Sequence, residues 1–340
     1  MAEYLDTIFI VYNILIRVPP KAVGRFRCVC NTWREYLSED TFIKLHSSRW
    51  AIASNQKALI LDRDSCSLHS VDFETHDYGP GRTLTIPFPH RSYNNVFNDV
   101  SILTHLNGIL CVAHNLTSDL YLWNPLTNAY TRLPPPFPNG FYSGKLDAVA
   151  LYTDMRGDFK VLYIRRRDGT LAAGSYSRSE QCWTDIPLTM PEEYLTTRYE
   201  WSAGTLCRGT LYFTLTECII PSNNRFLIDF DTNSELFSRM SFLPQIPNSG
   251  LTMVRLVDAK DQLVMFTATG FREMRIVMWV LQGEMWHQMH SLPAISLDQW
   301  TSLTHFVTTG DKWFVMAKYQ KYFEFHSVMK SYGRFYPETN

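Results

Sequence analysis

The chain has 340 residues and a nearly neutral formal charge, with 32 Lys and Arg against 33 Asp and Glu. Apolar residues make up 45% of the sequence and charged residues 19%, which allows a buried core and excludes a disordered chain. The balanced charge argues against a dedicated nucleic-acid binder, because such proteins usually carry a basic surplus. Aromatic residues reach 14%, a content that favours β-sheets over a helical bundle.

The cysteines and the N-terminus indicate a cellular compartment. The seven cysteines are odd in number and stand mostly within apolar runs, which is typical of free thiols in a reducing environment. The apolar stretch 8–16 is far shorter than the roughly 20 residues of a membrane-spanning helix. Glu3 and Asp6 precede it, where a signal peptide has a basic segment. We therefore expect a soluble protein of the cytoplasm or nucleus, with no membrane or nucleic-acid partner.

Residues 1–48 have the pattern of several short helices. Val18-Pro19 interrupts the first apolar stretch, because proline disfavours helix at the residue before it and suits the first turn of the next helix. Trp33 and Leu37 are four residues apart and so share one face of a later helix. A block of this size buries little core alone, so we expect it to lean on a partner.

From residue 51 to 340 the sequence consists of short β-rich segments separated by turn residues. The segments form a repeat that ends each time in an apolar residue followed by proline. These pairs are Ile86-Pro87, Leu133-Pro134, Ile186-Pro187, Leu243-Pro244, Leu292-Pro293 and Tyr336-Pro337. Their prolines are 44 to 57 residues apart, and a kelch-type propeller blade takes about 50 residues. We therefore predict a mainly β protein, with a small α-helical N-terminal module followed by a six-bladed kelch-like β-propeller; the alternative is a β-sandwich with a β-rich extension.

The segment 14–34 carries a specific motif, ILIRVPPKAVGRFRCVCNTWR. It closely resembles the plant F-box, whose pattern runs Ile-Leu-x-Arg-Leu-Pro-x-Lys and then Arg-Phe-Arg-Cys-Val-Cys-Lys-x-Trp-Arg. Downstream segments such as 106–111 and 122–125 are similar to the F-box-associated interaction domain, so the resemblance covers nearly the whole chain. It implies a non-catalytic substrate-recognition adaptor of a Skp1–cullin–F-box ubiquitin ligase. In one departure from the family, Asp6-Thr7 stands where members have Leu-Pro or Ile-Pro.

This resemblance implies that residues 1–48 bind a Skp1-like protein and, through it, a cullin. The residues that we expect at this contact are Leu15, Val18, Pro19, Val23, Phe26, Val29, Trp33 and Leu37. Five basic residues and no acidic one stand between positions 17 and 34, which suits an acidic partner. Two alternatives stay open. The apolar positions could dock on the propeller instead, or the chain could be a stand-alone interaction or ligand-binding propeller whose degenerate F-box no longer binds Skp1.

The sequence contains no motif of a known enzyme class, such as a phosphate-binding loop, a nucleophile elbow or a zinc-protease helix. Cys28 and Cys30 are too close together for a zinc knuckle, and we expect them to pack between helices. Asp229 and Asp231 alternate to one face of a strand, but Asp231 begins a turn of the repeat, where Asp usually bonds its own backbone. We therefore expect no catalytic residue, no metal and no cofactor.

A protein target is expected to bind loops, because propeller strands are occupied by packing between blades. Arg165, Arg166 and Arg167 precede an Asp-Gly hairpin turn and suit an acidic or phosphorylated segment, although such charges more often form a solvated strand edge. The long loops 134–144 and 190–201 carry aromatic residues of the kind that anchor protein contacts. The aromatic candidates are Phe137, Phe141, Tyr142, Tyr194, Tyr199 and Trp201. Alternatively, Phe137, Phe141 and Trp201 fold back to cover blade ends.

Overall fold

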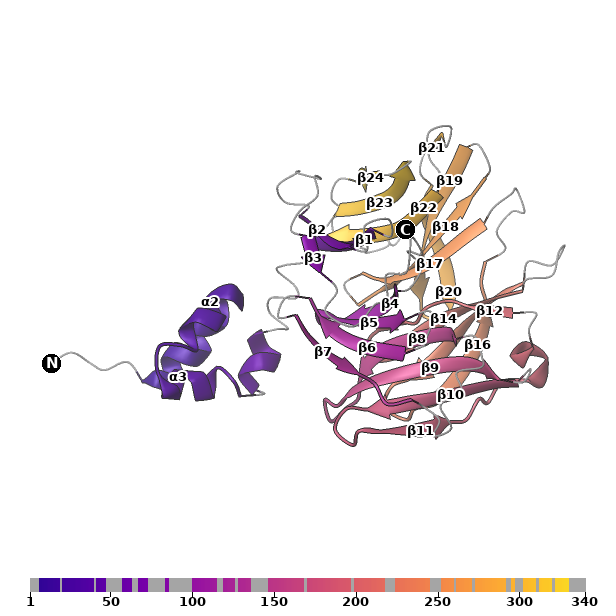
Figure 1. The fold of residues 1–340 in the computed structure, drawn as a ribbon. Helices are drawn as coiled ribbons and strands as arrows, with labels where there is room; N and C mark the ends of the chain where they lie inside the picture. Colours follow the sequence, from indigo (N-terminus) through magenta and orange to yellow (C-terminus); the bar gives the residue numbers. More distant parts are fainter. Residues whose placement is uncertain are drawn as a thin grey trace, which may run out of the picture.

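The computed structural model shows a small group of N-terminal helices beside a larger domain of β-sheets (Figure 1). The residues that the structure describes are 6–18, 20–39, 41–46, 57–62, 67–72, 83–85, 100–114, 119–125, 128–135, 146–167, 170–196, 199–217, 224–244, 252–259, 261–270, 273–291, 295–296, 302–309, 312–319 and 322–329.

The N-terminal module, residues 6–46, consists of short helical segments. They are α1 (Thr7–Phe9), a π-helical turn (Ile10–Ile14), a 3₁₀ turn (Leu15–Arg17), α2 (Pro20–Phe26), α3 (Asn31–Tyr36) and a last helix over 41–46. Asp6 begins the first helix, because its carboxylate accepts a hydrogen bond from the backbone N of Ile8 at 3.2 Å. Val18 is extended, with φ −86° and ψ 152°, so the first helical stretch ends at the residue before proline, as predicted.

Antiparallel strands form six sheets within the described residues, and most neighbouring strands are consecutive in the sequence. The first three sheets contain β1 (Lys57–Asp62), β2 (Ser67–Asp72) and β3 (Thr83–Thr85); β4 (Val100–Leu106), β5 (Ile109–His114), β6 (Asp119–Asn124) and β7 (Ala129–Arg132); and β8 (Leu146–Thr153), β9 (Phe159–Arg167), β10 (Thr170–Ser177) and β11 (Cys182–Ile186). The fourth contains β12 (Tyr199–Trp201), β13 (Thr205–Cys207), β14 (Thr210–Glu217), β15 (Arg225–Asp231) and β16 (Leu236–Phe242), where β12 and β13 both pair with β14. The last two contain β17 (Thr252–Asp258), β18 (Leu263–Thr269), β19 (Glu273–Gln282), β20 (Met285–Ser291) and β21 (Ile295–Ser296); and β22 (Ser302–Thr309), β23 (Lys312–Tyr319) and β24 (Tyr322–Met329).

The inner strands of successive sheets lie side by side. β4 lies beside β8, β8 beside β13, β13 beside β17, and β17 beside β22. Sheets that radiate from a shared set of inner strands are the blades of a propeller (Figure 1). The prediction of a mainly β chain with a six-bladed propeller after a helical module is confirmed.

Tight turns gather at one end of the blades. Asn107-Gly108 joins β4 to β5 with φ of 49° and 78°, and Arg208-Gly209 joins β13 to β14 with φ of 50° and 76°, as a two-residue hairpin turn of type I′ requires. We call this end the turn face; it carries the turns between first and second strands and between third and fourth strands. Because neighbouring strands are antiparallel, the links between blades and the loops between second and third strands lie at the opposite end, the loop face.

Apolar side chains fill the spaces between neighbouring blades. Between the third and fourth blades, Tyr152 and Ile164 pack with Phe213 and Ile228, and all four are fully buried. Three leucine or isoleucine residues of the repeated apolar–proline pairs are also buried: Leu133, Ile186 and Leu243 are 2%, 6% and 6% exposed. The pairs at Ile86, Leu292 and Tyr336 lie outside the described residues. The repeat read in the sequence therefore corresponds to the end of a blade's last strand.

Candidate protein-docking surfaces

The N-terminal module has a small apolar core of its own. The core residues are Val11, Leu15, Val23, Leu37 and Phe42. Phe26 and Trp33 cover it edge to face, with ring centroids 5.8 Å apart. Tyr12 donates a hydrogen bond to Glu39 Oε2 at 2.8 Å, which connects the first helical stretch to the residues just before the last helix. These contacts fix the order of the helices although each is only one or two turns long.

The eight residues predicted to contact Skp1 have different positions in this module. Leu15, Val23 and Leu37 belong to the core and are 3%, 8% and 1% exposed. Three others, Val18, Phe26 and Trp33, are partly buried against it. Val29 is 61% exposed, and Pro19 lies outside the described residues. The motif therefore combines residues that hold the module together with at least one that faces solvent.

Further apolar side chains of the module are exposed, among them Leu45, which the sequence pattern places with Phe42 on the apolar side of the last helix. They are Ile8, Phe9, Ile14, Ile43 and Leu45, between 45% and 51% exposed. Together with Val29 we call them the exposed apolar set. Their signal in the sequence is that segments 8–16 and 41–46 hold apolar residues at more positions than one buried helix face can accept. The exposed basic residues among the described part of the module are Arg17, Arg25, Arg27, Arg34 and Lys44.

The two cysteines of the module do not pack between helices, so that prediction is wrong. Cys28 and Cys30 are both exposed free thiols. The Cys30 Sγ accepts a hydrogen bond from the backbone N of Trp33 at 3.4 Å and so caps the start of α3.

The three arginines lie at the loop-face end of β9, where Arg167 pairs with Thr170 of β10. Arg165 is only 6% exposed. Arg166 donates hydrogen bonds to the carbonyl oxygens of Leu195 at 3.2 Å and Tyr199 at 3.3 Å. Its guanidinium also lies 3.6 Å from the Asp147 carboxylate. Arg166 thus holds the link between the third and fourth blades, rather than offering its charge to solvent.

The segment 190–201 is less a loop than predicted, because it contains a 3₁₀ turn (Glu192–Leu195) and strand β12. Tyr199 and Trp201 are 9% and 8% exposed, within the core between the third and fourth blades. The ring of Tyr194 lies 5.0 Å from that of Phe226. This favours the fold-back alternative for Trp201 and gives Tyr194 and Tyr199 a packing role. The other aromatic candidates lie outside the described residues; they are Phe137, Phe141 and Tyr142.

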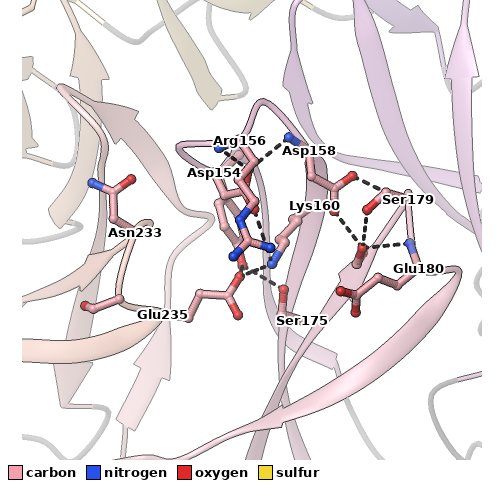
Figure 2. Close-up of polar contacts among 12 residues, drawn as sticks. Asp154, Arg156, Asp158, Lys160, Ser175, Ser179, Glu180, Asn233 and Glu235 are labelled. Carbon is pink, nitrogen blue, oxygen red and sulfur yellow. Dashed lines mark hydrogen bonds and ion pairs between the residues drawn. The ribbon is translucent and has the colours of Figure 1, made fainter.

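A polar network joins the third and fourth blades at the turn face (Figure 2). Lys160 Nζ donates to Glu235 Oε1 at 2.6 Å and lies 3.6 Å from Asp154 Oδ2. The Tyr152 hydroxyl donates to the same Glu235 oxygen at 2.7 Å and lies 2.6 Å from Ser175 Oγ. Burial tends to lower the pKa of Lys160, but the hydrogen bond and charge of Glu235 outweigh it, so the pKa is raised. Lys160 therefore stays charged at neutral pH, and its hydrogen bond to Glu235 links two blades.

The β8–β9 turn, residues 154–158, is fixed by the same network. Asp158 accepts hydrogen bonds from Ser177 Oγ at 2.6 Å and from the backbone N of Ser179 at 3.0 Å. Burial tends to raise the pKa of this carboxyl, but the hydrogen bonds from Ser177 and Ser179 outweigh it and the pKa is lowered. This turn is also where the N-terminal module meets the propeller, because a Cβ built on Gly157 would lie 2.7 Å from Lys44 Nζ.

The carboxylate that could have suggested catalysis is a turn residue, as predicted. Asp231 Oδ1 accepts hydrogen bonds from the backbone N of Asn233 at 2.8 Å and of Ser234 at 2.7 Å. Within the described parts of the chain, no three His, Cys, Asp or Glu side chains gather as metal ligands. Across those same parts, none of the helices is both long and apolar enough to span a bilayer.

Comparisons with known proteins cover both parts of the chain. The F-box domain family matches residues 9–45, and the F-box associated beta propeller domain family matches residues 60–329. A protein of Arabidopsis thaliana named among the F-box proteins is 24% identical over 313 residues, which cover 88% of this chain and 75% of that protein. An F-box/kelch-repeat protein of the same organism is 24% identical and covers 84% of this chain and 78% of that protein. Among solved structures, the Nup133 β-propeller domain of Vanderwaltozyma polyspora is 8% identical with a TM-score of 0.44, over 80% of this chain and 91% of that one.

Proposed function

The chain belongs to the F-box proteins that carry an F-box associated β-propeller domain, and from that premise we propose that it recruits a protein target to a Skp1–cullin–F-box ubiquitin ligase. Residues 1–48 dock on a Skp1-like protein that binds a cullin, and residues 51–340 hold the target, in the cytoplasm or nucleus. The chain itself performs no bond chemistry in this proposal. It raises the effective concentration of the target's lysines near the ubiquitin-carrying enzyme.

The observation that carries the proposal is the exposed apolar set of the N-terminal module. The module buries five side chains in its core and leaves six large apolar side chains 45–61% exposed. Exposed apolar groups in this density are typical of a protein-binding surface. The exposed arginines would steer an acidic partner toward it. In this arrangement Val29 and Ile43 contact Skp1 directly, whereas Leu15, Val23 and Leu37 support the surface from below.

We place the target on the loop face. β9 runs from the turn beside Lys44 to Arg167, and its nine residues span about 26 Å. The module and the loop face therefore lie at opposite ends of the third blade, which leaves the loop face open. The residues retained as candidates for target contact are Phe137, Phe141, Tyr142 and Arg167. We assign Arg165, Arg166, Tyr194, Tyr199 and Trp201 to supporting the loop-face conformation.

Co-purification with a Skp1-type protein tests the first half. Val29→Glu and Ile43→Glu are each expected to weaken binding by about tenfold or more, because a charge replaces an apolar contact. Met285→Glu is the matched control, since Met285 is 66% exposed on the propeller and should leave binding unchanged. A wild-type chain that does not bind, or variants that bind as well as it does, would favour the stand-alone propeller.

Proximity labelling in cells tests the second half. Phe141→Ala and Arg167→Ala are expected to lose labelled targets while Skp1 binding stays intact. Leu236→Ala, at an exposed position on the turn face, is the control and should keep them. Equal target capture by all three variants would place the target site elsewhere on the ring.

A further inference from the structure

We propose that the last helix of the N-terminal module, residues 41–46, docks on the β8–β9 turn of the third blade and holds the module in one orientation on the turn face. The contact lies within the chain and does not require Skp1. Its consequence, a fixed geometry between the Skp1-binding and target-binding surfaces, rests on the proposed function.

The helix has one side committed to the module. Phe42 is 1% and His46 7% exposed, and their rings stack with centroids 5.5 Å apart. His46 Nε2 donates a hydrogen bond to the carbonyl oxygen of Val18 at 2.9 Å. At about 100° per residue, Lys44 lies on the opposite side of the helix from Phe42 and His46. Its side chain therefore extends away from the module and toward the blade.

The β8–β9 turn has room for the Lys44 ammonium because residue 157 is glycine. A Cβ at Gly157 would lie 2.7 Å from Nζ and 3.4 Å from Cε of Lys44. Gly108 occupies the corresponding inner turn of the second blade with the same φ of +78°, and a Cβ there would meet nothing within 4 Å. The two glycines share the same φ and differ in their contact with the module.

The hydrogen bonds of the turn suit a cation. The backbone N of Arg156 and of Asp158 each donate to Asp154 Oδ1 at 2.9 Å, and the N of Gly157 donates to the Asp154 carbonyl at 2.9 Å. Because the backbone N–H groups of Arg156, Gly157 and Asp158 are already bonded, the turn offers mainly carbonyl oxygens to a neighbour. An ammonium group has three donors and no acceptor. Lys44 is thus matched to this turn in both space and hydrogen-bonding character.

The turn is also rigid enough to act as a seat. Asp154 is tied to Lys160, which bonds Glu235 of the fourth blade, and Asp158 is tied to Ser177 (Figure 2). A side chain that binds this turn is therefore held in a fixed position relative to both the third and the fourth blade. The module is oriented by a fixed part of the propeller rather than by a flexible surface loop.

Electron–electron distance measurements between two spin labels test the proposal on the isolated full chain. Exposed Cys28 in the module and exposed Cys182 in β11 are natural label sites. Three further cysteines are replaced, as Cys30→Ser, Cys66→Ser and Cys218→Ser, and the serine at position 30 keeps a side-chain acceptor that can cap α3. Cys111 and Cys207 are buried and stay.

The chain that carries labels at Cys28 and Cys182 and the three serine substitutions, the starting protein, is expected to give one narrow distance distribution. Lys44→Ala is expected to lose it and to give a broad distribution. Gly157→Ala is expected to broaden the distribution less, because the flexible end of the Lys44 side chain can move aside. Gly108→Ala, which carries the same backbone strain, is expected to keep the narrow distribution. A broad distribution in the starting protein, a narrow one in Lys44→Ala, or the same result for Gly157→Ala and Gly108→Ala would overturn the proposal. None of these readouts depends on Skp1 binding, so the proposed function can fail independently.

Discussion

The N-terminal module and the propeller bury their apolar side chains in different ways. Helix 41–46 buries Phe42 and leaves Ile43 and Leu45 about half exposed, because only one side of a short helix is covered. Strand β18 is buried at all seven positions, because each face of a blade meets a neighbouring blade. We therefore expect the module to bind a partner through its helix surfaces, and the propeller to bind one at the ends of its strands.

The largest effect is expected when a buried side chain between two blades is removed. Phe213 is fully buried, with Trp201 and Phe237 around its ring. Phe213→Ala is expected to lower the free energy of unfolding of the propeller by about 3–5 kcal/mol, because it leaves a cavity. Phe242→Ala is the matched control: Phe242 is 72% exposed at a blade end, with its ring 4.8 Å from that of Phe226, and the change should cost about 1 kcal/mol or less. Urea denaturation measures both, and equal losses would contradict the assignment of buried faces and free ends.

A second substitution tests whether the module is a separate cooperative unit. Leu37 is 1% exposed, and Leu37→Ala is expected to cost the module about 2–5 kcal/mol. Hydrogen exchange should then become faster in residues 6–46 and stay unchanged in the sheets. Leu45→Ala, the same change at a half-exposed position, should leave exchange in both parts as it was. Faster exchange in the sheets of the Leu37 variant would show that module and propeller unfold together.

The fold could be predicted from the sequence because each blade repeats the same local chemistry. The apolar residue before proline is buried in the blades where it is described, at Leu133, Ile186 and Leu243, so its spacing measured the blade length. The turn at Asp231 is also a matter of local chemistry, because an Asp side chain at the start of a turn accepts hydrogen bonds from the backbone of the next residues.

The docking surfaces were harder to predict, because exposure depends on tertiary packing. Apolar type alone does not distinguish Leu37 in the core from Val29 in solvent. Trp201 was placed on a loop, but β12 brings it under the inter-blade link. The sequence suggests Arg166 as a charge for a ligand, yet it donates hydrogen bonds to carbonyl oxygens of residues about thirty positions away. A local sequence pattern does not predict a contact between residues so far apart in the chain.

Substitutions in the polar network between the third and fourth blades are expected to lower the free energy of unfolding less than the loss of an apolar side chain between blades. The side chains of Lys160 and Glu235 are 17% and 21% exposed, so part of their interaction is screened by water. Lys160→Met and Glu235→Gln are each expected to cost about 1–3 kcal/mol, below the cost of breaking a fully buried pair. A double-mutant cycle by urea denaturation should give a coupling of about 1 kcal/mol. Arg132→Met, which removes the exposed partner of Asp119, is the control and should cost about 1 kcal/mol or less. Additive losses at Lys160 and Glu235 would mean that the pair does not link the blades.

The smallest effect concerns the pH dependence of a single turn. The backbone N–H groups of Ser234 and Asn233 donate to Asp231 and lower the pKa of its carboxyl. Because the folded pKa lies below the ordinary value of about 3.9, the charged carboxylate stabilises the fold above that pH, and this contribution is lost as pH falls through the lowered folded pKa. Asp231→Asn keeps an acceptor oxygen but removes the charge, so the variant is expected to be slightly less stable at pH 7. Its free energy of unfolding should also fall less steeply than that of the wild type between pH 5 and pH 2, measured by urea denaturation at each pH. Parallel curves for the two proteins would mean that the backbone hydrogen bonds of the turn do not favour the charged carboxylate.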